Sequence, residues 1–403
     1  MNNNLTNRLY FLDWVRIIAF IILIFYHTGM YYVTWGWHVK SPYASDAIEA
    51  MMLMSAPWRL GLLFFISGVA SSFLLSKTTI WSFVKQRSKR LLIPLLFGMA
   101  VIVPLQPYCE VIEKLHYQGS FIDFLKLYYT GYHGFCENGK CLDLPTWNHL
   151  WFVAYLFVYT LAYSALVALA AHRLPRITKV LVQALSGWRL LALPVIWFAV
   201  MRMGLKPWFP ETHALVNDWY NHAVYFPAFM VGALIAKERL FWQRMDDIRW
   251  PALAFAFASW GIMMAVFSLP DPFYEGPNGM LFKFIGRTAW SFCEWCPVIA
   301  ACGFAHRHLN FESPRRQYLT QAVFPVYILH QTIIVGFAHL IKPAALTPGV
   351  EYFVLIGVTF GLCFGSFAII RRVPLLMPLF GLSAPAKAGN GRATQPAETL
   401  SMT

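Results

Sequence analysis

Apolar segments long enough to cross a lipid bilayer recur along this chain and restrict what it can fold into. A helix of about 20 residues spans a hydrocarbon layer roughly 30 Å thick. Because lipid offers the backbone no hydrogen-bonding partners, such segments are expected to be helical. We predict an all-α, polytopic transmembrane helical bundle of about ten spans. They lie near residues 11–33, 50–75, 91–108, 148–170, 188–204, 220–236, 250–268, 279–305, 318–340 and 350–370.

The composition agrees with a membrane protein. Of the 403 residues, 58% are hydrophobic and 13% are charged, whereas about a quarter of a typical soluble domain is charged. Residues 1–381 are interpreted as one membrane domain because only the loop between Cys109 and Trp147 is long. Residues 382–403 are small, polar and interrupted by Pro and Gly, which is typical of a disordered tail.

The distribution of Lys and Arg predicts the orientation. If the N-terminus is cytoplasmic, the inner segments hold 21 Lys and Arg and the outer loops hold 6. Cytoplasmic loops carry the excess of these residues, so both termini are predicted to face the cytoplasm. The net charge of +13 then reflects topology and contact with anionic lipid. No nucleic-acid-binding motif is present, and no nucleic-acid partner is expected.

The first span carries ionisable residues in an otherwise apolar stretch. Arg16 and His27 are eleven residues apart, so on a helix they point about the same way and are separated by roughly 16 Å. Asp13 shares this face and can pair with Arg16. Ionisable groups inside a membrane normally face a protein interior or a wet cavity. The stripe is therefore predicted to line a cavity that crosses the membrane; the alternative is a structural hydrogen-bond network.

Further ionisable residues are embedded in later spans. Glu294 lies within SFCEWCPV and His330 within PVYILHQT, with Tyr327 one turn earlier, and His149 begins the fourth span. Each of them alone could be a packing residue. Together, the mid-membrane histidines and glutamate favour a reaction or proton path.

A basic cluster precedes the third span. Arg87 and Arg90 share a helical face and could hold phosphate groups bidentately; the alternative is simple positive-inside anchoring. In the second span, a small-residue surface would let another helix or a ligand come close; it consists of Ser67, Gly68, Ser71 and Ser72.

Six short motifs stand out along the chain. They are Arg16-x10-His27, LFFISG at 63–68, Arg87-x-x-Arg90, His149-Leu-Trp-Phe, Tyr10-Phe-Leu-Asp13 and Trp37-His38-Val39. Together these motifs resemble the membrane acyltransferase-3 family, and within it the glucan biosynthesis protein C branch. The resemblance covers essentially the whole membrane region. It implies transfer of an acyl group from cytoplasmic acyl-CoA to a sugar hydroxyl outside, across a bacterial inner membrane, and in this branch a succinyl group moved to a periplasmic glucan.

The resemblance and the residues together suggest roles. His27 is expected to act as the general base on the acceptor hydroxyl, with Arg16, Asp13, Glu294 and His330 as further catalytic candidates. The donor is acyl-CoA, with succinyl-CoA as the specific expectation, and its free carboxylate would need Arg16, Arg287 or Arg202. No metal is expected, because the histidine spacing matches no familiar zinc pattern. The expected donor-binding residues are Arg87, Arg90, Lys89 and Ser67, and the expected acceptor-binding residues are His38, Trp37, His149 and Trp151.

Other interpretations of the sequence stay open. The acceptor could be another envelope polysaccharide, and buried Arg, Glu and His would also suit a proton-coupled transporter or flippase, although no inverted repeat is evident. Cys136 and Cys141 lie in an outer loop where a disulfide is permitted. The oligomeric state is not predicted.

Overall fold

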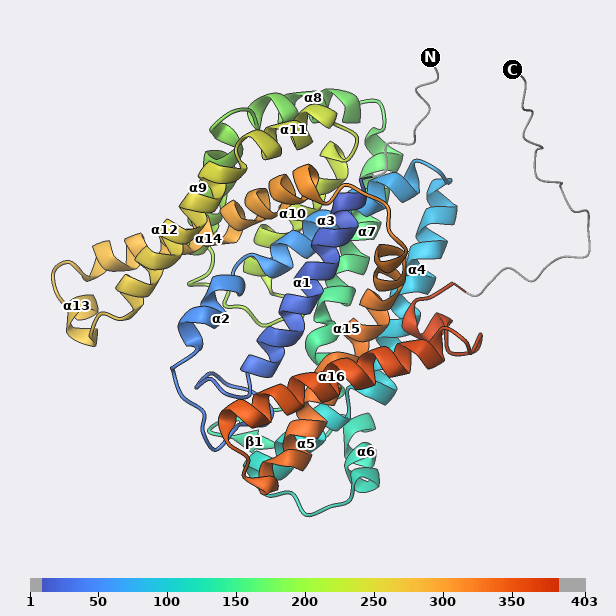
Figure 1. Cartoon of the computed structure of the whole chain (residues 1–403), viewed down its shortest axis with the longest axis vertical. Coiled ribbons are helices and arrows are strands. Elements are labelled where there is room, and N and C mark those ends of the chain that lie inside the picture. Colours follow the sequence, from blue (N-terminus) through green and yellow to red (C-terminus); the bar gives the residue numbers. More distant parts are fainter. Residues whose placement is uncertain (1–8, 384–403) are drawn as a thin grey trace, which may run out of the picture.

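The computed structural model describes residues 9–383, which form an almost entirely helical protein (Figure 1). The one small hairpin has strands β1 (Cys136–Glu137) and β2 (Lys140–Cys141). The helices are α1 (Tyr10–Gly29), α2 (Glu49–Ser55), α3 (Arg59–Leu75), α4 (Ile80–Phe97), α5 (Leu105–Leu115), α6 (Phe121–Tyr129), α7 (Trp151–Ala170), α8 (Leu174–Ala184), α9 (Arg189–Gly204), α10 (Trp219–Ile235), α11 (Arg239–Asp247), α12 (Arg249–Phe267), α13 (Asp271–Glu275), α14 (Gly279–His308), α15 (Pro314–Ile341) and α16 (Pro348–Ile370).

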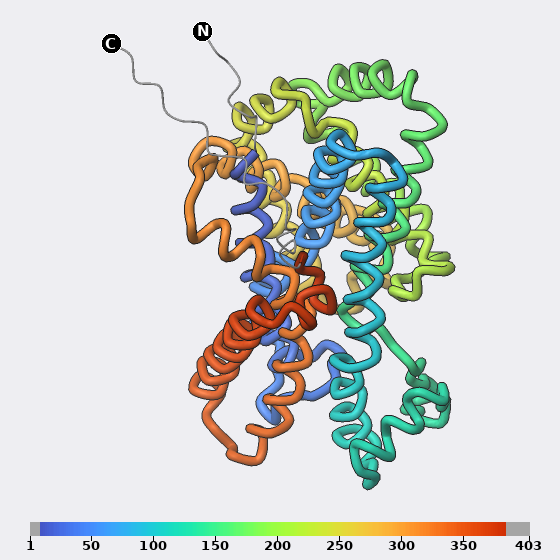
Figure 2. The backbone as a smooth tube through the Cα atoms, turned by 90° about the vertical axis from the view of Figure 1, so that its right-hand side faces the viewer, coloured from blue at the N-terminus to red at the C-terminus, as the bar shows by residue number. Residues whose placement is uncertain are grey.

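The helices run between two ends of the molecule. Figure 1 shows α8 and α11 at one end and α5, α6 and β1 at the other, with α1 crossing the space between them. The tube in Figure 2 shows the same separation from the side. The antiparallel pair α12 and α14 extends away from the rest, with α13 at its tip. The orientation of these ends relative to a membrane stays a prediction.

Each predicted span falls on helical structure, which confirms the all-α class. Within residues 9–383, seven helical stretches are long and apolar enough to cross a membrane, or eight if the bent pair α8 and α9 forms one span. Helix α10 has only 17 residues, and α14 contains Lys283, Arg287 and Glu294; neither of these helices is among the seven. The count of about ten spans therefore also stays a prediction.

The predicted boundaries differ from the structure where proline interrupts a helix. The segment 50–75 is divided at Pro57 into α2 and α3. The segment 91–108 belongs to a longer stretch, Ile80–Leu115, in which a wide helical turn at Gly98–Ile102 follows Pro94. Proline lacks the backbone N–H and clashes with the preceding turn, whereas hydropathy alone does not register such breaks.

The long loop between Cys109 and Trp147 has more structure than expected. It contains α6 and the β1–β2 hairpin, and a disulfide joins Cys136 to Cys141 across that hairpin. The disulfide that the sequence permits between these cysteines, without predicting it, is present. Of the predicted tail at 382–403, all but the first two residues lie outside the described part of the chain.

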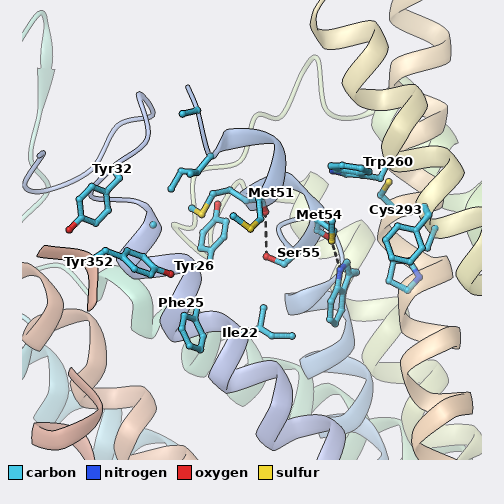
Figure 3. A pocket seen from close by; sticks show the side chains of 18 of the residues that line it. Ile22, Phe25, Tyr26, Tyr32, Met51, Met54, Ser55, Trp260, Cys293 and Tyr352 are labelled. Carbon is cyan, nitrogen blue, oxygen red and sulfur yellow. Dashed lines mark hydrogen bonds between the residues drawn. The ribbon is translucent and has the colours of Figure 1, made fainter. Parts of the chain in front are cut away.

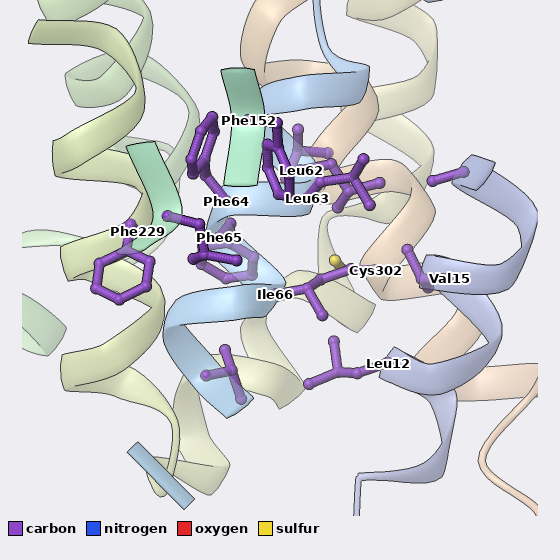
Figure 4. Close-up of a cluster of buried hydrophobic side chains, with 14 of the residues drawn as sticks. Leu12, Val15, Leu62, Leu63, Phe64, Phe65, Ile66, Phe152, Phe229 and Cys302 are labelled. Carbon is purple, nitrogen blue, oxygen red and sulfur yellow. The ribbon is translucent and has the colours of Figure 1, made fainter. Parts of the chain in front are cut away.

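Helices α3 and α10 pack with their backbones in contact. A Cβ atom on Gly68 of α3 would overlap the carbonyl oxygen of Phe229, and one on Gly232 of α10 would overlap that of Phe65. The small-residue surface in the second span therefore serves helix packing. Large apolar side chains fill the core beside this contact, including Phe64, Phe65, Phe152 and Phe229 (Figure 4).

Candidate active site

One face of helix α1 points into the protein, and the opposite face is exposed and apolar. His27 is half-buried and lines a cavity of about 650 Å³ within the protein. Residues spaced by three and four positions share its face of the helix, so Arg16, Phe20 and Leu23 point the same way. The prediction that His27 faces the interior is confirmed. The opposite face is exposed and apolar, and consists of Ile18, Ile21 and Phe25.

His27 is paired with a second histidine, His330 of α15. Nδ1 of His27 lies 2.8 Å from Nε2 of His330, and Nδ1 of His330 lies 2.7 Å from the carbonyl oxygen of Tyr327. A carbonyl only accepts, so His330 donates from Nδ1, and its Nε2 is the acceptor when the ring is neutral. His27 then donates from Nδ1. This hydrogen-bond network assigns the lone pair of His27 to Nε2, which has no partner among residues 9–383.

Two other histidines at the cavity have both ring nitrogens engaged by the protein. His38 contacts Glu110 through Nδ1 at 2.5 Å and Gln331 through Nε2 at 3.3 Å. His149 contacts the Ile328 carbonyl through Nε2 at 3.1 Å and Gln106 through Nδ1 at 3.3 Å. His38 and His149 therefore have structural partners, whereas His27 keeps one nitrogen available for a substrate.

Aromatic rings line much of the same cavity. The ring of Trp37 lies 5.5 Å from that of His27, and Trp151 stacks on His213 with 4.2 Å between ring centroids. Burial lowers the pKa of His213, which favours its neutral ring at this position. Flat apolar faces beside polar groups suit the faces and hydroxyls of a sugar ring. The aromatic lining consists of Tyr26, Trp35, Trp37, Trp147, Trp151, Phe152, Tyr220, Tyr225, Trp290 and Tyr327.

Glu294 is part of a buried ion pair at the cavity. Its Oε1 accepts from Arg202 of α9 at 2.6 Å and from the indole of Trp290 at 3.2 Å. Both members of the pair are 7% exposed. The second carboxylate oxygen, Oε2, has no hydrogen-bond partner, so it is free to accept a hydrogen bond from a ligand.

Asp13 and Arg16 belong to a separate cluster at the start of α1. Arg16 contacts Asp13 at 3.3 Å, and Asp13 also pairs with the fully buried Arg316 of α15. Arg316 pairs in turn with Glu312. Nothing specific in the sequence pointed to Arg316, because it counts as one more basic residue in a segment predicted to be cytoplasmic. None of these residues lines the cavity at His27.

The predicted donor-binding residues lie on α3 and α4. Arg87 is buried and donates to Ser71 at 3.0 Å, and the Ser71 hydroxyl donates to the carbonyl of Ser67 at 2.7 Å. Lys89 and Arg90 are exposed. Within residues 9–383 no carboxylate forms an ion pair with Arg87 or Arg90, and the charge of Arg16 acts on both. The cluster has unbalanced positive charge that suits phosphate groups.

The inward face of α1 is not polar along its whole length. Phe20 and Leu23 lie on it between Arg16 and His27, and both are buried. The Phe20 ring packs edge-on against Tyr327 at 5.5 Å. The cavity lining includes Leu23 and His27 but none of the three arginines Arg16, Arg87 and Arg90. The predicted cavity across the membrane is thus interrupted by packed apolar side chains.

A second cavity is apolar. It has a volume of about 940 Å³ and lies between α1, α2, α12, α14 and the start of α16. Figure 3 shows Ile22, Phe25 and Tyr26 of α1 facing Met51 and Met54 of α2. Tyr26 lines both cavities, but no charged side chain lines the apolar one. Groups for acid–base chemistry therefore gather in the polar cavity at His27. Among residues 9–383, no group of His, Cys, Asp and Glu is arranged to hold a metal ion.

Two cavity residues were not singled out from the sequence. Arg59 begins α3 and is buried, but a lone arginine at the edge of an apolar segment resembles an ordinary anchor. Gln331 follows His330 directly and links His38 to Gln106. The feature of the sequence that could have identified Gln331 is its place directly after His330, a candidate catalytic residue.

The structure thus places a half-buried histidine with one available ring nitrogen at a cavity lined by aromatic rings, inside a bundle of apolar helices. A model of the acyltransferase-3 family, described as an acyltransferase domain, matches residues 9–368. The chain belongs to the acyltransferase-3 family.

The chain is also similar to proteins named glucans biosynthesis protein C. The relative from Escherichia coli O1:K1 / APEC is 25% identical over 408 residues, covering 98% of this chain and 99% of the relative. Those from E. coli strains SMS-3-5 and K12 / DH10B are 26% and 25% identical over 412 residues, with the same coverage. No solved structure matches the chain.

Proposed function

We propose that this protein moves an acyl group from a cytoplasmic coenzyme A thioester to a carbohydrate hydroxyl, with His27 as the general base. The observation that carries the proposal is the hydrogen bond between His27 Nδ1 and His330 Nε2. It leaves the Nε2 lone pair of His27 available at a cavity lined by aromatic rings. A sugar hydroxyl is a poor nucleophile at neutral pH and needs such a base within hydrogen-bond reach.

The reaction needs one base and no covalent enzyme intermediate. The hydroxyl proton moves to Nε2 of His27 as the hydroxyl oxygen attacks the thioester carbonyl carbon. The carbon–sulfur bond of the tetrahedral intermediate then breaks, and the imidazolium returns the proton to the sulfur. The products are an ester and free coenzyme A. His330 accepts the hydrogen bond from Nδ1–H of His27 and so holds the ring in the reactive tautomer.

The acceptor is proposed to be a periplasmic glucan. The aromatic lining supports a sugar, and Oε2 of Glu294 offers an unpaired acceptor for a hydroxyl. The names of the similar proteins refer to glucans, which favours this acceptor over other envelope polysaccharides. The protein would lie in a bacterial inner membrane with both termini in the cytoplasm, as the Lys and Arg distribution predicts.

The donor is proposed to be acyl-CoA, with a succinyl group as the specific acyl chain. Its phosphates would lie on Arg87 and Arg90, helped by Lys89 and Ser67. The pantetheine arm, on the order of 15–20 Å, would cover the rise of about 16 Å between Arg16 and His27. Since Phe20 and Leu23 are packed along this path, the arm must displace them to reach His27.

Acyl transfer in reconstituted vesicles tests the base. With succinyl-CoA on one side and glucan on the other, His27→Ala should lower kcat by about 10²–10⁴-fold, the usual contribution of general-base catalysis. The matched control is His133→Ala, which removes an exposed loop histidine and should leave kcat unchanged. Transfer by His27→Ala at the wild-type rate would refute the assignment. Mass spectrometry of glucans from cells with and without the gene identifies the acyl group and acceptor.

The thermal unfolding midpoint tests the donor site without any catalysis. Coenzyme A should raise the midpoint of the wild-type protein, because a ligand that binds the native state stabilises it. The double variant Arg87→Ala/Arg90→Ala should lose this response, and the exposed double change Arg173→Ala/Arg176→Ala should keep it. A wild-type protein that does not respond to coenzyme A argues for a carrier function instead.

A further inference from the structure

Arg59 is a buried cation without an anionic partner in the described part of the chain. It is the first residue of α3 and only 4% exposed, and it lines the polar cavity together with His27. Its guanidinium lies 3.6 Å from the centre of the Tyr26 ring, which stabilises the charge in part. Its Nε and Nη1 atoms have no hydrogen-bond partner. Arginine N–H groups buried in this way are normally bonded, so the site lacks an acceptor.

The charges at the cavity do not balance. Besides Arg59, the cationic lining residues are Arg202 and Lys206, and the carboxylates are Glu211 and Glu294. Arg202 pairs with Glu294 at 2.6 Å and Lys206 pairs with Glu211 at 2.5 Å. One positive charge, that of Arg59, therefore stays uncompensated before any histidine is protonated.

We propose that Arg59 binds the free carboxylate of an acyl group derived from a dicarboxylic acid, while the thioester carbonyl of the same group lies at His27. This assignment rests on the proposed function and identifies the class of donor. Arg59 thereby takes the role of carboxylate-binding cation that the sequence suggested for three other arginines. Arg16 and Arg202 already have carboxylate partners, and Arg287 is exposed.

A permanent anion suits Arg59 better than a transient one. The alternative partner for Arg59 is the oxyanion of the tetrahedral intermediate. This oxyanion exists only while the intermediate does, so the buried guanidinium would be unpaired through the rest of the cycle, which is unfavourable. A carboxylate stays ionised in every step. Arginine also holds a carboxylate with two N–H groups at once, unlike lysine.

The same contact would assist the base. Arg59 and His27 line the same cavity, so the charge of Arg59 opposes the positive charge that the ring gains when it takes the hydroxyl proton. A carboxylate bound to Arg59 removes that repulsion. A donor that ends in a methyl group leaves the repulsion in place, so the wild-type protein should prefer succinyl-CoA to butyryl-CoA, which has the same chain length.

The test compares these two donors in the full-length protein in vesicles. Arg59→Gln should lower kcat/KM for succinyl-CoA by about 10–100-fold, the effect of losing one hydrogen bond to a charged group. It should change kcat/KM for butyryl-CoA by less than about threefold, and Arg59→Lys should restore part of the succinyl rate. The control, Arg176→Gln, removes an exposed arginine of α8 and should alter neither donor. An equal loss with both donors, or no loss, overturns the proposal.

A binding measurement covers the case in which Arg59→Gln folds poorly or the wild-type protein transfers no acyl group. Succinate should raise the thermal unfolding midpoint of the wild-type protein and of Arg59→Lys, whereas the neutral succinamide should not. A response to both compounds or to neither contradicts the carboxylate site. A wild-type protein that binds succinate but transfers from neither donor overturns the proposed function and leaves the site standing.

Discussion

Nδ1 of His27 lies 2.8 Å from Nε2 of His330, and the planes of the two rings differ by 5°. The residues are 303 positions apart and belong to the first and the second-last long helices. His330 is itself oriented by the Tyr327 carbonyl. The contact therefore determines which nitrogen of His27 can accept a proton.

Replacing His330 should impair catalysis through His27. His330→Ala removes the acceptor of the Nδ1–H bond, so we expect kcat to fall by about tenfold or more, the effect of losing a hydrogen bond of roughly 1–1.5 kcal/mol, with a small change in KM. His330→Gln can still accept through its amide oxygen and should recover part of the rate. Steady-state kinetics with both substrates check this. Equal activity of the Ala and Gln variants would contradict the orienting role.

Removing one partner of the Arg202–Glu294 pair should destabilise the fold. Glu294→Ala leaves a buried, unpaired guanidinium, and we expect a loss of about 3–5 kcal/mol in the free energy of unfolding. The double variant Arg202→Met/Glu294→Ala should be more stable than Glu294→Ala, because no uncompensated charge stays buried. Chemical unfolding in detergent measures both. A double variant less stable than either single one would show that the pair adds net stability.

The contact between α3 and α10 should tolerate no side chain at Gly68. Gly68→Ala places a methyl group against the Phe229 carbonyl, and such overpacking costs about 1–3 kcal/mol. Gly61→Ala, earlier in the same helix, meets no atom within 4 Å and should be neutral or slightly stabilising, because alanine favours helices. Thermal unfolding distinguishes the two variants. If Gly68→Ala and Gly61→Ala had the same thermal unfolding midpoint, the backbones of α3 and α10 would lie farther apart than described.

A larger side chain at position 20 should obstruct the donor arm. Phe20→Trp adds volume on the face of α1 between Arg16 and His27, so kcat/KM for acyl-CoA should fall by about tenfold or more, the equivalent of about 1.4 kcal/mol of overpacking. Binding of coenzyme A itself should persist, because Arg87 and Arg90 are unchanged. Ile18→Trp, on the exposed face, is the control. Unaltered transfer by Phe20→Trp would place the donor path elsewhere.

The positions of the helices could be predicted because their signals are local. Hydropathy marks segments that must avoid water, and the 100° turn per residue places Arg16 and His27 on one face of α1. The same local view missed the breaks at Pro57 and near Pro94. It also treated the face of α1 as a polar stripe, although Phe20 and Leu23 lie on it, since polar residues are more conspicuous in an apolar segment.

By itself, then, the sequence determined that this chain forms apolar helices, where they lie, and that His27 points inward. Only the tertiary structure decided which groups meet. Arg202 finds Glu294 across 92 residues, whereas Arg59 pairs with no carboxylate among residues 9–383, and its Nε and Nη1 atoms have no hydrogen-bond partner there. The physical reason is that hydropathy and helical periodicity depend on neighbours along the chain. The partner of a buried charge depends on which helices pack side by side, and that is set by side-chain shape summed over the whole bundle.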